Sequence, residues 1–251
     1  LGPLDREMAL PVEEALRAAG AEVILGDALQ EIQTTPEGGM AVLRAGRSVI
    51  SNSQDLINDP STQDKGLSGQ AVQEQVLQAY LEANGEPPLT ADLSDKERRM
   101  TETQLAAMVE VIDENQTIIN AEGIEFKGFI PAIFARLVNE KFAEEMSSEA
   151  RVKVTAPKDL VRNRMARPDG WENQVIEEKF RKGDWPIGEA FYEQTTVDGK
   201  PAFRMLIPEY YSDSCLACHG SPAGETDVTG FPKEGGSLGD LAGAISITLF
   251  E

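Results

Sequence analysis

Both cysteines and the one histidine of this 251-residue chain stand within five consecutive residues, Cys215 to His219. A disulfide framework is therefore excluded, because no third cysteine exists to build one, and the fold has to rest on a hydrophobic core. The length is enough for one large domain or two small ones, and the 41% of hydrophobic residues is enough for a sizeable core. This composition is neither that of a disordered protein nor that of a membrane protein.

The five residues read Cys-Leu-Ala-Cys-His, which is the Cys-x-x-Cys-His pattern of c-type haem attachment. Two thiols three residues apart lie on one side of a turn, where they can add to the two vinyl groups of a haem as thioethers. The next residue, His219, then points its imidazole at the iron. We therefore expect one haem c, attached covalently through Cys215 and Cys218, with His219 as the proximal iron ligand.

Two other uses of Cys-x-x-Cys are weighed against haem attachment. A thioredoxin-like dithiol would stand at the start of a helix that follows a strand, whereas this motif runs into residues 220–224, which do not continue a helix. A structural zinc site needs four ligands, and only three soft ligands exist. Adjacent Cys218 and His219 would also be strained in sharing one tetrahedral ion with Cys215. Both uses are less favoured than haem.

The periodicity of apolar residues divides the chain. Helical patterns fill the first half, with a capping box at Ser94 and Glu97 before a long helix that Gly123 ends, and Pro131 in the first turn of the next helix. The second half reads as strands with one capped helix, and it contains a hairpin around Asp198-Gly199. We predict an α+β fold, in which a helical N-terminal half precedes an antiparallel sheet with helices on one face.

The chain resembles a bacterial family of PAS-like, single-haem c-type cytochrome domains, formerly a domain of unknown function, over about residues 40–251. This resemblance implies a PAS-like sheet, covalent haem, and export to the periplasm or the outer face of the cell. Family members occur as free-standing proteins and as sensor domains. The matching segments are residues 53–60, Lys65-Gly66, Ile119-Asn120, residues 127–132, 162–164, 167–169, 208–211, 215–220 and 239–244.

With this resemblance the domain prediction becomes specific. We expect a helical lead-in over residues 1–38, a helical segment that covers the haem over residues 39–125, and a PAS-like c-type haem domain over residues 126–251.

The sixth position of the iron cannot take a second histidine, because His219 is the only one in the chain. Met108, on an apolar helix face, and Met205, on the strand that leads to the motif, are distal candidates, although a methionine is more easily explained as a filler of the core. In the family, a distal Met or Cys comes from the segment before the helix that Pro131 opens here. This chain has Lys127, Gly128 and Phe129 there, so Lys127 and an open iron site are further candidates.

Haem propionates are carboxylates, which prefer arginine or tyrosine partners. The alternative for any single arginine is an ordinary surface ion pair. The candidates in this chain are Arg162, Arg164, Arg204, Tyr210 and Tyr211.

The formal net charge of −20 is expected to repel nucleic acid and anionic lipid and to attract a redox partner with a basic docking surface. No apolar stretch reaches the ~20 residues of a membrane-spanning helix. The chain begins with Leu1 rather than Met, and together with the haem motif this leads us to expect that a leader was removed and that the protein is periplasmic or extracellular.

These features predict a monohaem cytochrome that transfers single electrons, either as a free carrier, as a homodimer or as a subunit of a larger complex. The alternative is a haem-based sensor of redox state or of a small gaseous ligand, which would signal through a partner protein. No catalytic constellation is visible in the sequence, and a peroxidase is not supported because the only histidine is already assigned. We expect an electron carrier or a sensor rather than a catalyst.

Overall fold

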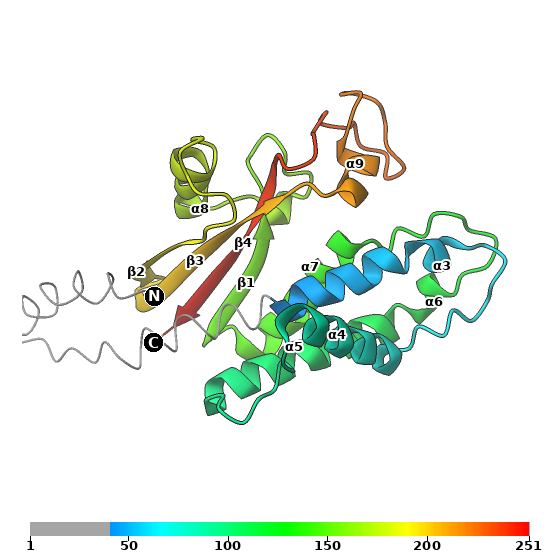
Figure 1. The fold of residues 1–251 in the computed structure, drawn as a ribbon, viewed down its shortest axis with the longest axis horizontal. Helices are drawn as coiled ribbons and strands as arrows, with labels where there is room; N and C mark the ends of the chain where they lie inside the picture. Colours follow the sequence, from blue (N-terminus) through cyan, green and yellow to red (C-terminus); the bar gives the residue numbers. More distant parts are fainter. Residues whose placement is uncertain (1–40, 251) are drawn as a thin grey trace, which may run out of the picture. The chain divides into compact units, whose positions relative to one another are not determined.

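The computed structural model describes residues 41–250, which belong to one compact unit that begins at Gly38. The lead-in predicted over residues 1–38 lies outside the described residues. Figure 1 shows helices in the first half of the described chain and a four-stranded antiparallel sheet in the second. The predicted α+β class is therefore confirmed. Within residues 41–250, no helix is long and apolar enough to cross a membrane.

Two helices of the first half begin where the sequence predicts. Ser94 and Glu97 form the expected capping box, and Pro131 occupies the first turn of its helix. The long helix predicted up to Gly123 ends earlier, because the Asn115 side chain donates a hydrogen bond to the Val111 carbonyl (2.7 Å) and the chain turns there. The elements are a helix over residues 41–52, α3 (Gln54–Asn58), α4 (Gly69–Asn84), α5 (Asp95–Glu114), α6 (Gln116–Ile119) and α7 (Pro131–Met146).

Buried apolar residues of these helices form one hydrophobic cluster. Gly46 allows the helix over residues 41–52 to come close to its neighbours, because a Cβ at this position would lie 3.0 Å from the Phe134 ring and 3.2 Å from the Met108 sulfur. Val152 and Val154 of the first strand pack against the same cluster, and α7 contacts both α5 and that strand. The domain boundary that we predict near residue 125 stays a prediction.

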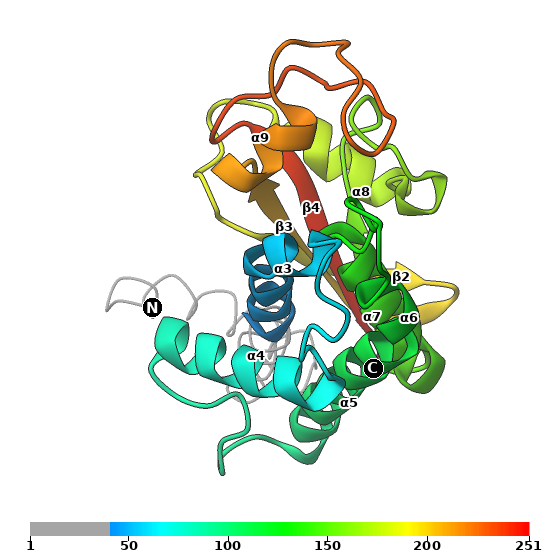
Figure 2. The same ribbon diagram turned by 90° about the vertical axis from the view of Figure 1, so that its right-hand side faces the viewer.

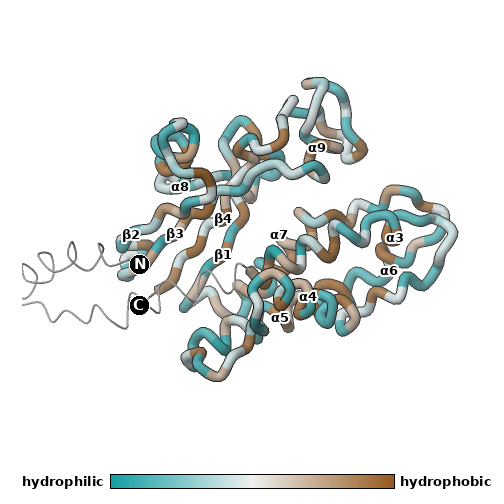
Figure 3. The backbone as a smooth tube through the Cα atoms, in the orientation of Figure 1, coloured by the Kyte–Doolittle hydropathy of each residue, from teal (hydrophilic) through white to brown (hydrophobic). Residues whose placement is uncertain are grey.

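The second half contains the sheet. Its strand order is β1-β4-β3-β2, with every neighbouring pair antiparallel, so the first and last strands lie side by side. Figure 3 shows hydrophobic residues along the central strands β3 and β4. The elements are β1 (Ala150–Thr155), a 3-10 turn (Arg164–Ala166), α8 (Gly170–Val175) continued by a π-helical turn (Ile176–Phe180), β2 (Phe191–Val197), β3 (Lys200–Tyr210), α9 (Asp213–His219) and β4 (Leu241–Phe250).

Helix α8 covers one face of the sheet. Leu206 of β3 packs with Val175, Ile176 and Phe180, and the predicted capping residues Asp169 and Glu172 start the helix. Because side chains alternate along a strand, the odd-numbered residues of β3 face away from α8. One of them, Glu209, pairs with Arg44 and Arg47 of the helix over residues 41–52 at 2.8 and 2.7 Å. These ion pairs bring the helix over residues 41–52 close to the end of β3 that leads into α9 (Figure 2).

Candidate functional site

The Cys-x-x-Cys-His motif lies in a short helix, α9, directly after β3 (Figure 1). The expectation that the motif lies in a turn is wrong, because Ser212 has an extended backbone and the helix runs from Asp213 to His219 before Gly220 leaves it. A helix directly after a strand is also where a thioredoxin-like dithiol would stand, so the position of the motif no longer argues against that use. In a helix, positions i, i+3 and i+4 share one face. Cys215, Cys218 and His219 therefore lie on the same side of α9.

The imidazole of His219 is held on two sides. Its Nδ1 lies 2.8 Å from Oε2 of Glu234, and its ring stacks on that of Tyr211 with centroids 5.2 Å apart. Gly236 closes over Tyr211, where a Cβ would come within 2.5 Å of the ring, and its N–H donates to the His219 carbonyl at 2.8 Å. Among the described residues, Nε2 of His219 has no hydrogen-bond partner, and the side chain is 31% exposed.

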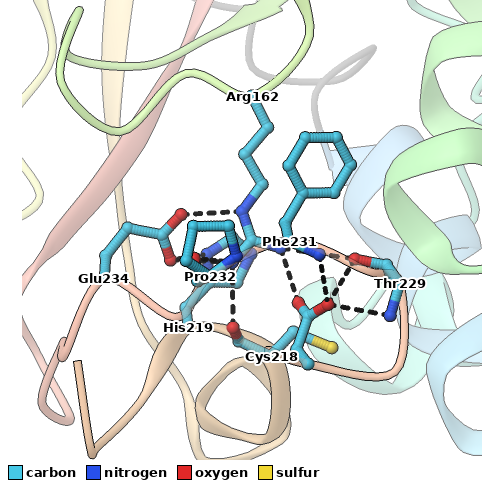
Figure 4. A network of polar contacts seen from close by, with 8 residues as sticks. Arg162, Cys218, His219, Thr229, Phe231, Pro232 and Glu234 are labelled. Carbon is cyan, nitrogen blue, oxygen red and sulfur yellow. Dashed lines mark hydrogen bonds and ion pairs between the residues drawn. The ribbon is translucent and has the colours of Figure 1, made fainter. Parts of the chain in front are cut away.

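Arg162 joins the motif to the loop that follows it (Figure 4). Its guanidinium binds Glu234 through Nε (2.7 Å) and Asp227 through a terminal nitrogen (2.6 Å). The other terminal nitrogen donates to the carbonyl of Cys218 at 2.9 Å. One side chain from the segment after β1 thus fixes both α9 and the loop over residues 220–240.

The carboxylates of this network are ionised. Although burial alone would raise the pKa of Glu234, hydrogen bonds from Arg162 and His219 hold it below its ordinary value. For Asp227, burial acts in the same raising direction, but hydrogen bonds from Thr229 and Arg162 hold its pKa well below the ordinary range. An ionised carboxylate only accepts hydrogen bonds. Nδ1 of His219 therefore carries a proton, and in the neutral form of the imidazole Nε2 is the nitrogen with the lone pair.

Cys218 shows no sign of activation as a redox thiol. Burial, with a contribution from Asp227, raises the pKa of Cys218, whereas reactive Cys-x-x-Cys pairs have a thiol with a lowered pKa. Within residues 41–250, no three His, Cys, Asp or Glu side chains lie close enough together to hold a metal ion. The raised pKa of Cys218 therefore disfavours a redox dithiol.

These residues fit a c-type haem. Two thiols on one helix face can form two thioethers. In the adjacent imidazole, Nδ1 is anchored by Glu234 and Nε2 is free to bind iron. Once bound, such a haem supplies an iron that changes between the ferric and ferrous states.

The propionate candidates do not gather in one place. Arg162 lies at the site, but protein groups already occupy its donors. Arg164 is exposed, and its side chain makes no hydrogen bond or ion pair with another residue of the described range. Arg204 lies on the α8 side of the sheet, where it pairs with Asp169 at 2.8 Å and covers the Trp171 ring.

The two tyrosines also differ. Tyr210 accepts a hydrogen bond from the Gly188 N–H through its hydroxyl (3.1 Å). Tyr211 belongs to the site through its stack on His219, and burial, with Glu234 nearby, raises its pKa to about 12. Tyr211 is therefore an uncharged wall of the site at neutral pH.

The distal candidates also lie apart from one another. Met108 is 1% exposed and packs in the helical cluster beside Gly46. Met205 is buried in the middle of β3, six residues and roughly 20 Å of strand before Tyr211. The Nζ of Lys127 donates to the Ile119 carbonyl at 3.0 Å. Each position has a structural explanation, and distal ligation by any of the three stays a prediction.

Sequence reasoning missed Glu234 and Asp227. Both stand in a glycine-rich loop that the sequence presents only as a connection. The Asp-x-Thr turn at Asp227, where the Thr229 N–H and hydroxyl both bind the carboxylate, is a local signal. No signal in the sequence places Glu234 beside His219, because that contact depends on how the whole loop folds back.

Residues 69–249 match the family model of the Tll0287-like proteins, whose description is Tll0287. The chain belongs to the Tll0287-like family. The match extends from the start of α4 to the last strand, so this Tll0287-like region includes α9, Arg162 and the loop that carries Glu234. No curated protein and no solved structure matches the chain.

Proposed function

We propose that this Tll0287-like protein is a monohaem c-type cytochrome that transfers single electrons. The observation that carries this proposal is the arrangement on α9, where both thiols and the imidazole share one helix face and Nε2 of His219 is free while Nδ1 is anchored. The PAS-like description of the sheet is part of the same proposal. The four-stranded antiparallel sheet and the helices before it agree with it at the level of fold class.

The chain's own residues have separate tasks in this proposal. Cys215 and Cys218 hold the cofactor covalently, so it cannot dissociate during redox cycling. His219 presents Nε2 to the iron, and Tyr211 limits rotation of its ring by stacking. Arg162 keeps the loop that carries Glu234 closed against α9.

The partner is a redox protein with a basic surface. With 43 acidic and 23 basic residues, the chain attracts such a surface over a Debye length, and this attraction weakens as salt is added. Export to the periplasm or the cell exterior belongs to this proposal too. Fractionation of cells that make the holoprotein tests the location, and holoprotein found only in the cytoplasm contradicts it.

Absorption spectra of the oxidised and reduced protein, with and without carbon monoxide, test the function. An electron carrier with a filled sixth position should show low-spin spectra and no carbon monoxide binding. High-spin spectra with ready carbon monoxide binding would favour the alternative, a sensor that signals through a partner protein. A protein produced in an exporting host that shows no haem absorption contradicts both.

A further inference from the structure

We propose that Glu234 is a positioning residue that shifts the redox equilibrium of the haem toward the ferric state. Its carboxylate does so by accepting a hydrogen bond from Nδ1 of the proximal imidazole of His219, which makes this imidazole a stronger electron donor. This inference rests on the function proposed above and concerns the outer side of the same site. It starts from the shortest contact of the imidazole, the 2.8 Å between Nδ1 and Oε2 of Glu234.

The Glu234 carboxylate is itself held in place. Arg162 donates to Oε1 from Nε (2.7 Å) and to Oε2 from a terminal nitrogen (2.9 Å). This bidentate pair fixes the plane of the carboxylate. Oε2 accepts from both Arg162 and His219. The glutamate side chain is 15% exposed, so water competes little for these bonds.

The charges of Arg162, Asp227 and Glu234 do not cancel. Arg162 contributes one positive charge, and Asp227 and Glu234 contribute one negative charge each, which leaves a net charge of −1. Glu234, not Asp227, contacts the ring. A carboxylate that accepts the Nδ1 proton raises the basicity of the imidazole as a ligand. A more electron-donating ligand stabilises ferric over ferrous iron and lowers the potential.

Glu234 also ties the loop to Arg162, so a purely structural role has to be separated from a role at the haem. The variant Glu234→Gln keeps the size and a hydrogen-bond acceptor but removes the charge. The variant Glu234→Asp keeps the charge but shortens the side chain by one methylene, which breaks the contact with Nδ1. Glu225→Gln is the matched control: Glu225 stands on the same loop, is 53% exposed and pairs with Lys233 at 3.7 Å.

The experiment is a spectroelectrochemical titration of the four proteins after haem content and circular dichroism have been compared. We expect Glu234→Gln to raise the midpoint potential. The expected change in the ferric/ferrous equilibrium constant is about tenfold, which corresponds to ~59 mV for one electron. Glu234→Asp should raise it by a smaller amount. Glu225→Gln should leave it close to the value of the unmodified protein.

The outcomes separate this inference from the function beneath it. If haem is attached but Glu234→Gln shifts the potential no more than Glu225→Gln, general charge is responsible and the role of Glu234 is refuted. If Glu234→Gln does not fold, Glu234→Asp decides, and an unmodified potential in that variant refutes the role as well. A native chain without haem overturns the proposed function and this inference with it.

Discussion

The charged cluster beside α9 and the lysine cluster at the end of the helical half both tie loops together, but with different partners. In the first, Arg162 is matched by the carboxylates of Asp227 and Glu234. In the second, Lys65 is buried and donates to the carbonyls of Asp59 and Thr62, and Lys127 donates to that of Ile119. One cluster therefore pairs opposite charges, and the other places two cations around backbone oxygens.

This difference separates a candidate site from a structural joint. The α9 cluster leaves one ring nitrogen of His219 without a partner among the described residues. The lysine cluster uses its donors to close the loops around Asn58 and Asn120, whose side chains accept from the backbone N–H groups of Lys127 and Lys65. Segments that the sequence marks as a family pattern thus meet at the lysine cluster to hold the fold.

The largest effect should come from breaking the charge pairing in the α9 cluster. Arg162→Ala should lower the free energy of unfolding by about 3 kcal/mol, because it leaves the largely buried Glu234 carboxylate without its cation. Arg164→Ala is the matched control, since Arg164 is exposed and two residues away, and it should change stability by less than ~0.5 kcal/mol. Urea unfolding measures both, and equal effects would contradict the role of Arg162.

A smaller effect is expected in the lysine cluster. Lys65→Met should cost about 1–3 kcal/mol, because the carbonyls of Asp59 and Thr62 lose a buried donor. Lys127→Met should cost less, since it also removes a like charge beside Lys65. Neither should change the haem spectrum. If Lys127→Met changes the spectrum, whether to high spin or to that of a methionine-ligated haem, Lys127 is a distal ligand and the lysine cluster is more than a structural joint.

The two clusters should respond to opposite ends of the pH range. The pKa values of Asp227 and Glu234 are lowered in the folded protein, so their stabilisation is present above the unfolded value of about 4 and is lost as pH falls through the folded values. Burial and neighbouring Lys65 lower the pKa of Lys127. Its unfolded state therefore binds the proton more tightly, and stability rises with pH between the folded value and about 10.4.

Urea midpoints measured from acid to alkaline pH test these signs. Lys127→Met should abolish the alkaline rise and leave the acid loss unchanged. An alkaline rise that persists in this variant would show that another group causes it.

The smallest effect on stability is expected at the ion pairs of Glu209. Glu209 pairs with Arg44 and Arg47, whose side chains are partly exposed. Glu209→Gln should therefore cost no more than about 1 kcal/mol, and the cost should shrink in high salt. A cost as large as that of Arg162→Ala, measured by the same urea titrations, would mean that exposure does not distinguish the two ion pairs.

Local signals explain what the sequence predicts correctly. The capping boxes at Ser94 and Asp169 and the proline at the start of α7 each involve residues within one turn of one another. The hairpin also depends on two residues, Asp198 and Gly199, whose positive φ angles of 53° and 78° suit the turn between twisted strands. Such features need no long-range contact to form.

Features that depend on contacts between residues distant in the chain could not be predicted from the sequence. Helix α9 is seven residues long, too short for periodicity to reveal it. The contact of Glu234 with His219 spans 15 residues of loop, and that of Arg162 with Glu234 spans 72. The motif itself could be recognised because its chemistry is contained in five residues, whereas the groups that orient it come together only in the fold.

The most direct test of the central proposal is the intact mass of the denatured chain after production in a host that exports it and attaches haem. The proposal predicts a chain heavier by one haem, which survives unfolding and acid acetone extraction. The Cys215→Ala/Cys218→Ala variant should have the mass of the polypeptide alone. A native chain whose denatured mass is that of the polypeptide, or whose haem is extracted freely, contradicts the assignment of this protein as a c-type cytochrome.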